Sequence, residues 1–365
     1  MLTQETNPTL LQTRQHFEVL DGLRGVAAVA VVIFHFMELI KPDYHDNFIA
    51  HAYFAVDFFF CLSGFVIAYA YDQRIRQMGI STFLKLRLIR LHPLVVIGSV
   101  IGLLAFVFDP FSTLYQKYAD RIIPMFITSC LMIPYPLVKE RYFNLFHLNP
   151  PTWSLFWEYI ANLIYVLFLV KINHKILWLL TIAAAVALAF EAHRSNFLGV
   201  GFGGDNVMGG GYRMLYSFLA GILVYRSQWI IPSKLGLVSL SILLLLSFLI
   251  PFSKHTSRLV DPLVLIFYLP FLVALGAGAT HHLVYQKICK FLGDISYPLY
   301  MTHYPFIWLV LSYMEVKKPS VQEMVVVMIA GVILLILFAY AVMVLLDIPL
   351  RKYFTHRLKR GWTKS

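Results

Sequence analysis

Long apolar stretches alternate with short polar connections along almost the whole chain. A helix of about twenty apolar residues is long enough to cross a bilayer. Ten stretches approach or exceed this length: residues 19–39, 52–72, 88–108, 152–170, 175–191, 210–226, 235–251, 260–279, 295–314 and 321–347. This pattern predicts an all-α, polytopic integral membrane protein with about ten transmembrane helices.

An eleventh apolar run, residues 121–134, is shorter and contains Pro124 and Pro134. Whether it crosses the membrane decides on which side every later loop lies. With ten spans, one side receives 18 Lys and Arg residues and the other side 10. Short loops rich in Lys and Arg face the cytoplasm. We therefore predict ten spans in a plasma (bacterial inner) membrane, both termini cytoplasmic, and a re-entrant or interfacial segment at 121–134.

Three parts follow from this topology: a cytoplasmic N-terminal segment, residues 1–17, a transmembrane domain, residues 18–349, and a basic cytoplasmic tail, residues 350–365. The first 17 residues lack the apolar core of a signal peptide, so we expect the first span to act as an uncleaved anchor. The glycine-rich stretch 199–211 is expected to be a flexible external loop.

The composition agrees with a membrane protein, since 59% of the residues are hydrophobic and 13% are charged. The net charge of +11 does not indicate nucleic-acid binding, because the basic residues gather in short loops and in the tail, as membrane topology requires. The cysteines, Cys61, Cys130 and Cys289, lie in or beside apolar segments without metal-ligand spacing. We interpret them as core residues and expect neither a disulfide nor a metal site.

The first span carries an arginine and a histidine, Arg24 and His35, well inside its apolar run. Charged side chains inside a membrane cost at least about 2.5–3.5 kcal/mol on insertion scales, which makes them functional candidates. Eleven positions correspond to about three helical turns, so the two residues share one face about 16 Å apart along the axis. Such an alignment indicates a route or a reaction.

Counting residues from the span ends gives the depth of the other ionisable groups. The predicted outer level contains His35, Asp57, Glu158 and Arg213. The predicted inner level contains Arg24, Arg87, Arg90, Asp294 and Asp347. His303 is expected between the two levels.

Each of these groups also has a purely structural interpretation. His35 is either a core histidine bonded to a carbonyl or a general base, with Asp57 as the carboxylate that fixes its tautomer. Arg24 can pair with Asp21 one turn earlier, which does not exclude contact with a ligand. Two further arginines, Arg87 and Arg90, are either ordinary cytoplasmic anchors or contacts for an anionic phosphate.

Five motifs together resemble the acyltransferase-3 family of integral-membrane acyltransferases: LDGLRGVAAVAVVIFH, VDFFFCLSGFVI, RLIRLHPL, PTWSLFWEYIANLIY and GDISYPLYMTHYP. The resemblance covers residues 17 to 354 and implies a ten-helix core that acylates hydroxyl groups. The residues matching family motifs are Arg24, His35, Arg87, Arg90, Pro93, Trp153, Ser154, Leu155, Glu158, Ser296, Tyr297 and His303. His92 departs from the family pattern, which often has an aromatic residue there. We also expect no appended soluble esterase-like domain.

The resemblance implies transfer of an acyl group, most often acetyl, from cytoplasmic acyl-CoA to an acceptor at the extracytoplasmic face. The donor is acetyl-CoA or another acyl-CoA, with no permanently bound cofactor. The acceptor is a carbohydrate, a glycolipid or a small molecule with a hydroxyl group. We expect catalytic roles for His35, Asp57, Glu158 and His303, donor contacts from Arg24, Arg87 and Arg90, and acceptor contacts from Trp153, Ser154, Arg213 and Tyr297.

The mechanism expected from these roles has the donor phosphates at the arginines and the acyl group at His35. Asp57 or Glu158 orients His35, which acts as a general base or carries the acyl group. The alternative interpretation is a transporter that exports a small polar or anionic molecule. A transporter usually gathers its charges around one midplane site, whereas this sequence places them at two depths.

Overall fold

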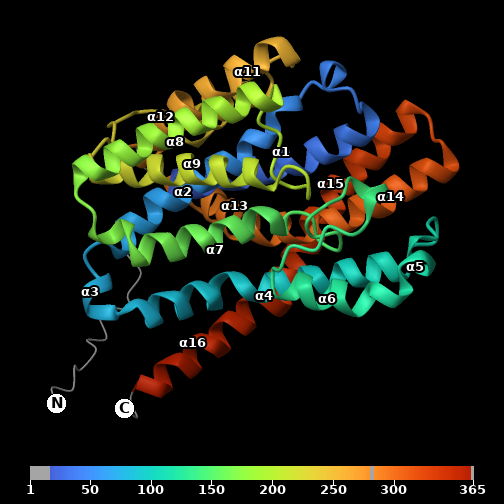
Figure 1. The fold of residues 1–365 in the computed structure, drawn as a ribbon, viewed down its shortest axis with the longest axis horizontal. Coiled ribbons are helices and arrows are strands. Elements are labelled where there is room, and N and C mark those ends of the chain that lie inside the picture. Colours follow the sequence, from blue (N-terminus) through green and yellow to red (C-terminus); the bar gives the residue numbers. More distant parts are fainter. Residues whose placement is uncertain (1–16, 280–282, 363–365) are drawn as a thin grey trace.

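The computed structural model describes residues 17–279 and 283–362, and these residues form a bundle of long helices (Figure 1). The described residues contain two isolated β-bridges, and none of them forms an extended β-strand. The predicted all-α, polytopic class is therefore confirmed. Of the predicted N-terminal segment 1–17, only Phe17 lies among the described residues.

Eight helical segments among the described residues are long and apolar enough to cross a membrane. They are α1 (Glu18–Ile40), η3 (Ala50–Tyr53) with α2 (Phe54–Tyr71), α4 (Ile80–Val107), α7 (Thr152–Leu167) with η6 (Leu169–Lys171), α8 (His174–Ser195), α9 (Val207–Arg226), the run of α11 (Lys254–Leu263), η7 (Val264–Tyr268) and α12 (Leu269–Ala277), and the run of α15 (Val321–Val342), η8 (Met343–Asp347) and α16 (Ile348–Trp362). The remaining helices are η2 (Tyr44–Asp46), α3 (Ile75–Met78), α5 (Leu114–Lys117), η4 (Ala119–Arg121), α6 (Ile122–Cys130), η5 (Lys139–Arg141), α10 (Leu237–Phe248), α13 (Leu283–Thr302) and α14 (Tyr304–Lys317).

The bundle has two ends, which we name by their contents. The basic end holds the start of α1 and the basic helix α16, and the loop end holds residues 41–53, 109–151 and 196–206 (Figure 1). The helix α10 and the pair α13–α14 also run between these ends. Leu237 and Cys289 both adjoin Gly22 at the basic end, whereas Glu315 bonds Arg141 at the loop end. With these two, the described residues contain the ten passes expected from the sequence.

The ninth predicted span, residues 295–314, differs from the structure because the helix begins at Leu283 and is interrupted at His303. Pro305 has no N–H to donate to the carbonyl of Met301, four residues earlier. The side-chain amide of Asn149 donates to this carbonyl instead, at 2.9 Å. The interruption is therefore stabilised by a residue from a distant loop.

The short apolar run at 121–134 does not cross the bundle. Its helix α6 has nine residues and lies beside the part of α4 near the loop end (Figure 1). Ser129 of α6 and Ser99 of α4 hydrogen-bond at 2.8 Å, and the chain then turns back at Met132, which has a φ of 53°. This arrangement agrees with the predicted re-entrant or interfacial segment, since residues 121–134 do not form an additional pass.

The helix α7 begins inside the bundle rather than at its surface. The residues before it, 144–151, are irregular and all buried. They pack against α4, where Gly98 and Gly102 leave room for the backbone of Leu148 and the side chain of Asn149. Irregular backbone at membrane depth requires such cover from surrounding protein.

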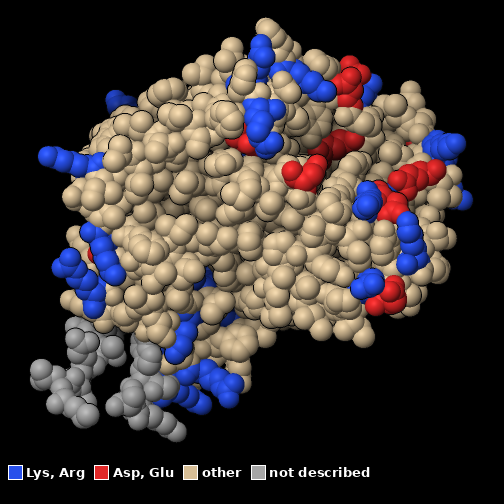
Figure 2. Space-filling model, in the orientation of Figure 1, with Lys and Arg blue, Asp and Glu red and all other residues tan. Residues whose placement is uncertain are grey.

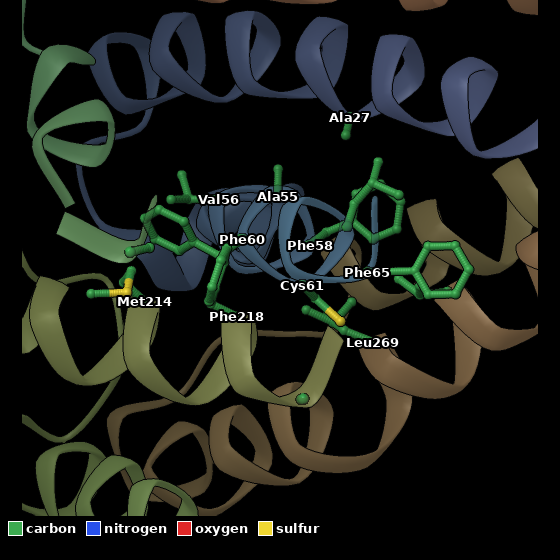
Figure 3. Packing of buried hydrophobic residues seen from close by; sticks show 14 of the residues in the cluster. Ala27, Ala55, Val56, Phe58, Phe60, Cys61, Phe65, Met214, Phe218 and Leu269 are labelled. Atoms are coloured by element: carbon green, nitrogen blue, oxygen red, sulfur yellow. The ribbon is translucent and has the colours of Figure 1, made fainter. Parts of the chain in front are cut away.

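Close packing of α2 on α9 forms the centre of the bundle (Figure 3). A side chain on Gly64 would collide with the backbone of Phe218, and one on Gly221 would collide with the backbone of Cys61. The glycine-rich stretch 199–211 was predicted to be a loop, which is wrong for its last five residues because α9 begins at Val207. Gly201, Gly210 and Gly211 pack against tryptophan rings of α7.

Candidate active site

A chain of polar side chains surrounds His35 near the loop end of α1. The imidazole Nδ1 donates to Glu38 Oε2 at 2.6 Å, and Glu38 Oε1 accepts from the Tyr44 hydroxyl at 2.5 Å. Burial and the Glu38 carboxylate raise the pKa of Tyr44 well above its ordinary value, so the phenol remains a donor. No described residue bonds Nε2 of His35, and the side chain is 19% exposed. His35 therefore has a fixed tautomer with a free basic nitrogen.

A second imidazole lies against the first at the interruption between α13 and α14. The rings of His303 and His35 are 5.3 Å apart and within 19° of parallel. His303 Nδ1 contacts the carbonyls of Leu299 and Tyr300 at 3.1 and 2.9 Å, which makes Nδ1 the donor. Its Nε2 is buried without a partner. The structure thus brings together two predicted catalytic residues, each with an unbonded Nε2.

The predicted pairing of His35 with Asp57 is wrong. Asp57 forms an ion pair with Arg213 instead, with Nη2 2.6 Å from Oδ2, and both side chains are almost completely buried. Five hydrogen bonds hold the guanidinium, including donations to the carbonyls of Val200 and Tyr53. Arg213 also lies 5.4 Å above the ring of Trp153. The physical reason is direction, because Asp57 on α2 faces α9.

Arg24 lies near the basic end and contacts the same helix pair as His35. Its Nε donates to Ser296 Oγ at 2.8 Å, and Nη2 donates to the carbonyl of Gly293 at 2.7 Å. Asp21 lies 3.2 Å from Nη2, as the structural interpretation expected. Both residues of the first span thus face α13 and α14, one near each end.

Glu158 does not lie at the level of His35, contrary to the prediction. Its Oε1 accepts from Arg87 at 2.9 Å and from Ser63 at 2.5 Å. The depth count assumed that α7 begins at the membrane surface, whereas α7 begins inside the bundle. Glu158, six residues into α7, therefore lies at the level of Arg87. Arg87 itself is about ten ångströms along α4 from the first residue of that helix.

Arg90 completes the cluster of arginines at the basic end. It lies within Coulombic range of Arg87 and Arg24. Its side chain is exposed, and none of the described residues pairs with it. Figure 2 shows Lys and Arg gathered around the C-terminal helix, whereas the acidic side chains on this face lie mainly toward the loop end. Arg90 is thus a cation available to an anionic ligand.

The remaining predicted residues make contacts within the protein. Ser154 hydrogen-bonds the hydroxyl of Tyr300 at 2.8 Å, and Tyr297 donates to the carbonyl of Leu91 at 2.6 Å. Trp153 is buried beside Arg213. Their predicted contacts with an acceptor remain predictions.

Sequence reasoning missed Glu38 and Tyr44, the two residues that hold His35. Glu38 is three positions after His35, a spacing that places both on one helix face. This signal was present in the sequence, but Glu38 was counted as a residue at the span end. Tyr44 is in the loop that follows, and no periodic pattern identifies it.

Comparisons with known proteins show which family the chain resembles. The model of the acyltransferase-3 family, described as an acyltransferase domain, matches residues 17–346. Protein 2 in the picA locus of Rhizobium radiobacter is 32% identical over 188 residues, which cover 49% of this chain and 95% of that protein. No solved structure gives a significant match.

Proposed function

The chain belongs to the acyltransferase-3 family, and from that premise we propose that this membrane acyltransferase transfers an acyl group, most simply acetyl, from acyl-CoA to a hydroxyl group. The proposed acceptor is a carbohydrate, a glycolipid or another hydroxyl compound. The observation that carries the proposal is the His35–Glu38–Tyr44 chain, which leaves Nε2 of His35 free. A positioned imidazole of this kind suits a general base.

In the proposed reaction, the acceptor oxygen attacks the thioester carbonyl carbon while Nε2 of His35 takes the hydroxyl proton. The carbon–sulfur bond breaks, and the proton passes to the thiolate of coenzyme A. The imidazolium that forms is stabilised by the carboxylate of Glu38, 2.6 Å away. His303 lies against His35 and has its own free Nε2, which accepts a hydrogen bond from the acceptor.

We propose that the donor binds at the basic end, where Arg24, Arg87 and Arg90 hold its phosphates. Arginine suits this task because its planar fork forms charge-assisted bonds to phosphate oxygens. The extended pantetheine arm then covers the distance of about 16 Å between Arg24 and His35. This placement corresponds to a cytoplasmic basic end and an extracytoplasmic loop end in a bacterial inner membrane.

The structure adds one condition to this route. Ala28 and Val31 lie between Arg24 and His35 on the same face of α1, and both are buried. The arm must therefore separate the contacts of this face or pass beside them. The helix pair α13–α14 covers this face and is interrupted at His303.

Two chemical routes use these same atoms. In the direct route the acceptor attacks the thioester, and in the covalent route Nε2 of His35 first forms an acyl-imidazole. Single-turnover labelling with radioactive acetyl-CoA in the absence of acceptor separates them. Accumulation of labelled protein supports the covalent route, whereas its absence supports direct transfer.

The function is tested with purified protein in lipid nanodiscs, supplied with acetyl-CoA and a panel of glycosides. We expect acyl transfer by the wild type and at least a hundredfold loss in His35→Ala. His193→Ala, which changes an exposed histidine of α8, is the matched control and keeps wild-type activity. Arg24→Ala raises the KM for acyl-CoA. Near wild-type transfer by His35→Ala would contradict the proposed base.

A further inference from the structure

Tyr142 is an aromatic residue that neither the fold nor the proposed reaction explains. It lies in the loop-end segment before α7, and its side chain is 60% exposed. Its φ is 60°, and the next residue, Phe143, has a φ of 49°. Two consecutive bulky residues in the left-handed region are rare, and such backbone persists only when the surroundings enforce it.

Anchors on both sides of Tyr142 enforce this conformation. On one side, the buried guanidinium of Arg141 bonds Glu315 at 2.7 Å and Ser312 at 2.8 Å on α14. On the other side, the carbonyl of Phe143 accepts from the backbone of Gly204 at 3.0 Å. The chain therefore presents Tyr142 between two fixed points.

The ring of Tyr142 lies at one end of a series of aromatic contacts that leads to the site. Its centroid is 6.2 Å from that of the Trp308 ring, and the two rings are within 17° of parallel. The ring centroids of Trp308 and Tyr304 are 4.9 Å apart and those of Tyr304 and His35 are 4.7 Å apart, both in edge-to-face geometry. The guanidinium of Arg141 lies 5.7 Å from the Trp308 ring. Trp308 itself is buried, so Tyr142 is the exposed end of this series.

One face of the Tyr142 ring packs on Trp308, and the side chain is otherwise exposed. Burial and the charge of Glu38 raise the pKa of the Tyr142 phenol above its ordinary value. A ring bound on the exposed side of Tyr142 would thus lie at the outer end of the aromatic contacts that lead to His35. A sugar ring suits this surface because its C–H groups pack on an aromatic face while its hydroxyl groups point sideways.

We propose that Tyr142 is the stacking platform for a sugar ring of the acceptor and makes the protein prefer cyclic sugars over open-chain alcohols. This inference rests on the proposed function and specifies its acceptor class. An alternative role for an exposed tyrosine is an anchor at the membrane–water interface. That role predicts altered stability after substitution but an unaltered preference between acceptors.

The test measures binding and turnover separately, in wild type, Tyr142→Ala and Tyr142→Phe. Binding is measured without acyl-CoA, by saturation-transfer NMR with methyl β-glucopyranoside and with sorbitol as probes. We expect the wild type to bind the glycoside more strongly than sorbitol, Tyr142→Phe to retain this binding, and Tyr142→Ala to lose about tenfold in affinity. Acyl-CoA hydrolysis without acceptor stays at the wild-type rate in all three.

Two further variants separate the ring from the backbone. Tyr142→Gly relaxes the left-handed conformation and removes the ring, so it loses binding as Tyr142→Ala does. Phe48→Ala removes an exposed aromatic side chain elsewhere in the loops of the loop end and keeps wild-type binding. Equal glycoside binding by wild type and Tyr142→Ala, or no glycoside binding by the wild type, would overturn the inference. Failure of the proposed function shows separately, as wild-type protein that binds glycoside without transferring an acyl group.

Discussion

The Asp57–Arg213 ion pair joins α2 to α9, whereas the hydrogen-bonded His35–Glu38 pair lies within α1, and the two pairs differ in how many of their polar atoms are bonded. Asp57 and Arg213 are 0% and 1% exposed, and the arginine makes five hydrogen bonds. His35 and Glu38 are 19% and 28% exposed, and Nε2 of His35 has no partner among the described residues. The sequence alone does not tell which pair is functional, because both contain ionisable residues within membrane spans, where burial costs free energy.

The two pairs differ in function because of free hydrogen-bonding capacity, not because of the free energy needed to bury them. A buried ion pair whose atoms are all bonded joins the elements that carry it, here α2 and α9. A pair that leaves one basic nitrogen open is prepared to bind or to react. The following predictions test this difference, beginning with the largest effect.

Removing the cation from the fully bonded Asp57–Arg213 pair should prevent stable folding. Arg213→Met leaves the Asp57 carboxylate buried without a partner, which costs about 3–5 kcal/mol. We expect strongly reduced yield of folded protein and a lower unfolding temperature, measured by tryptophan fluorescence in detergent. Arg121→Met, which breaks an exposed ion pair with Asp120, is the control and has little effect. A folded, inactive Arg213→Met protein would instead place this pair in the active site.

Altering the His35–Glu38 pair should reduce activity without lowering the stability of the fold. Glu38→Gln keeps the shape of the side chain but weakens its stabilisation of protonated His35, so kcat falls by about tenfold to a hundredfold. The unfolding temperature stays within a few degrees of the wild-type value. Asp46→Asn changes an exposed acid in the following loop and leaves both quantities unchanged. A large loss of stability in Glu38→Gln would show that the two pairs have the same structural role.

The smallest effect is expected at Tyr44. Tyr44→Phe removes one of the two hydrogen bonds to Glu38, and we expect kcat to fall about threefold because the bond to His35 remains. Since the pKa of Tyr44 is raised, its hydroxyl donates throughout the range below its ordinary value of about 10, and the contribution is lost only as pH rises through the raised value. The ratio of wild-type to variant kcat should therefore be constant from pH 6 to pH 9. A ratio that changes in this range would contradict a protonated Tyr44.

Much of this arrangement could be predicted from the sequence because apolar length and loop charge are strong signals. They gave the ten passes, the short segment at 121–134 that does not cross the bundle, and the shared face of Arg24 and His35. They could not give the rotation of one helix relative to another, which decides that Asp57 meets Arg213. Depth counting also failed for Glu158, because it requires each helix to begin at the membrane surface.

The sequence analysis also did not predict the interruption at His303, for a different reason. Hydrophobicity continues across residues 295–314, so apolar length alone joins α13 to α14. Pro305 is a local signal, since it removes one backbone donor. The replacement donor, Asn149, is more than 150 positions away in the sequence and is recognised only in three dimensions.

The late start of α7 has a consequence for how this architecture diversifies. Near the loop end, the volume in front of α7 is filled by irregular chain, residues 135–151 and 197–206. Irregular segments accept insertions and exchanges that a membrane helix, with its fixed register, does not. The arginines of the basic end lie on helices α1 and α4, outside these segments. The acceptor recognition proposed for the loop end can therefore change through replacement of a few residues in the connecting segments. The helices that hold the arginines then keep their sequence.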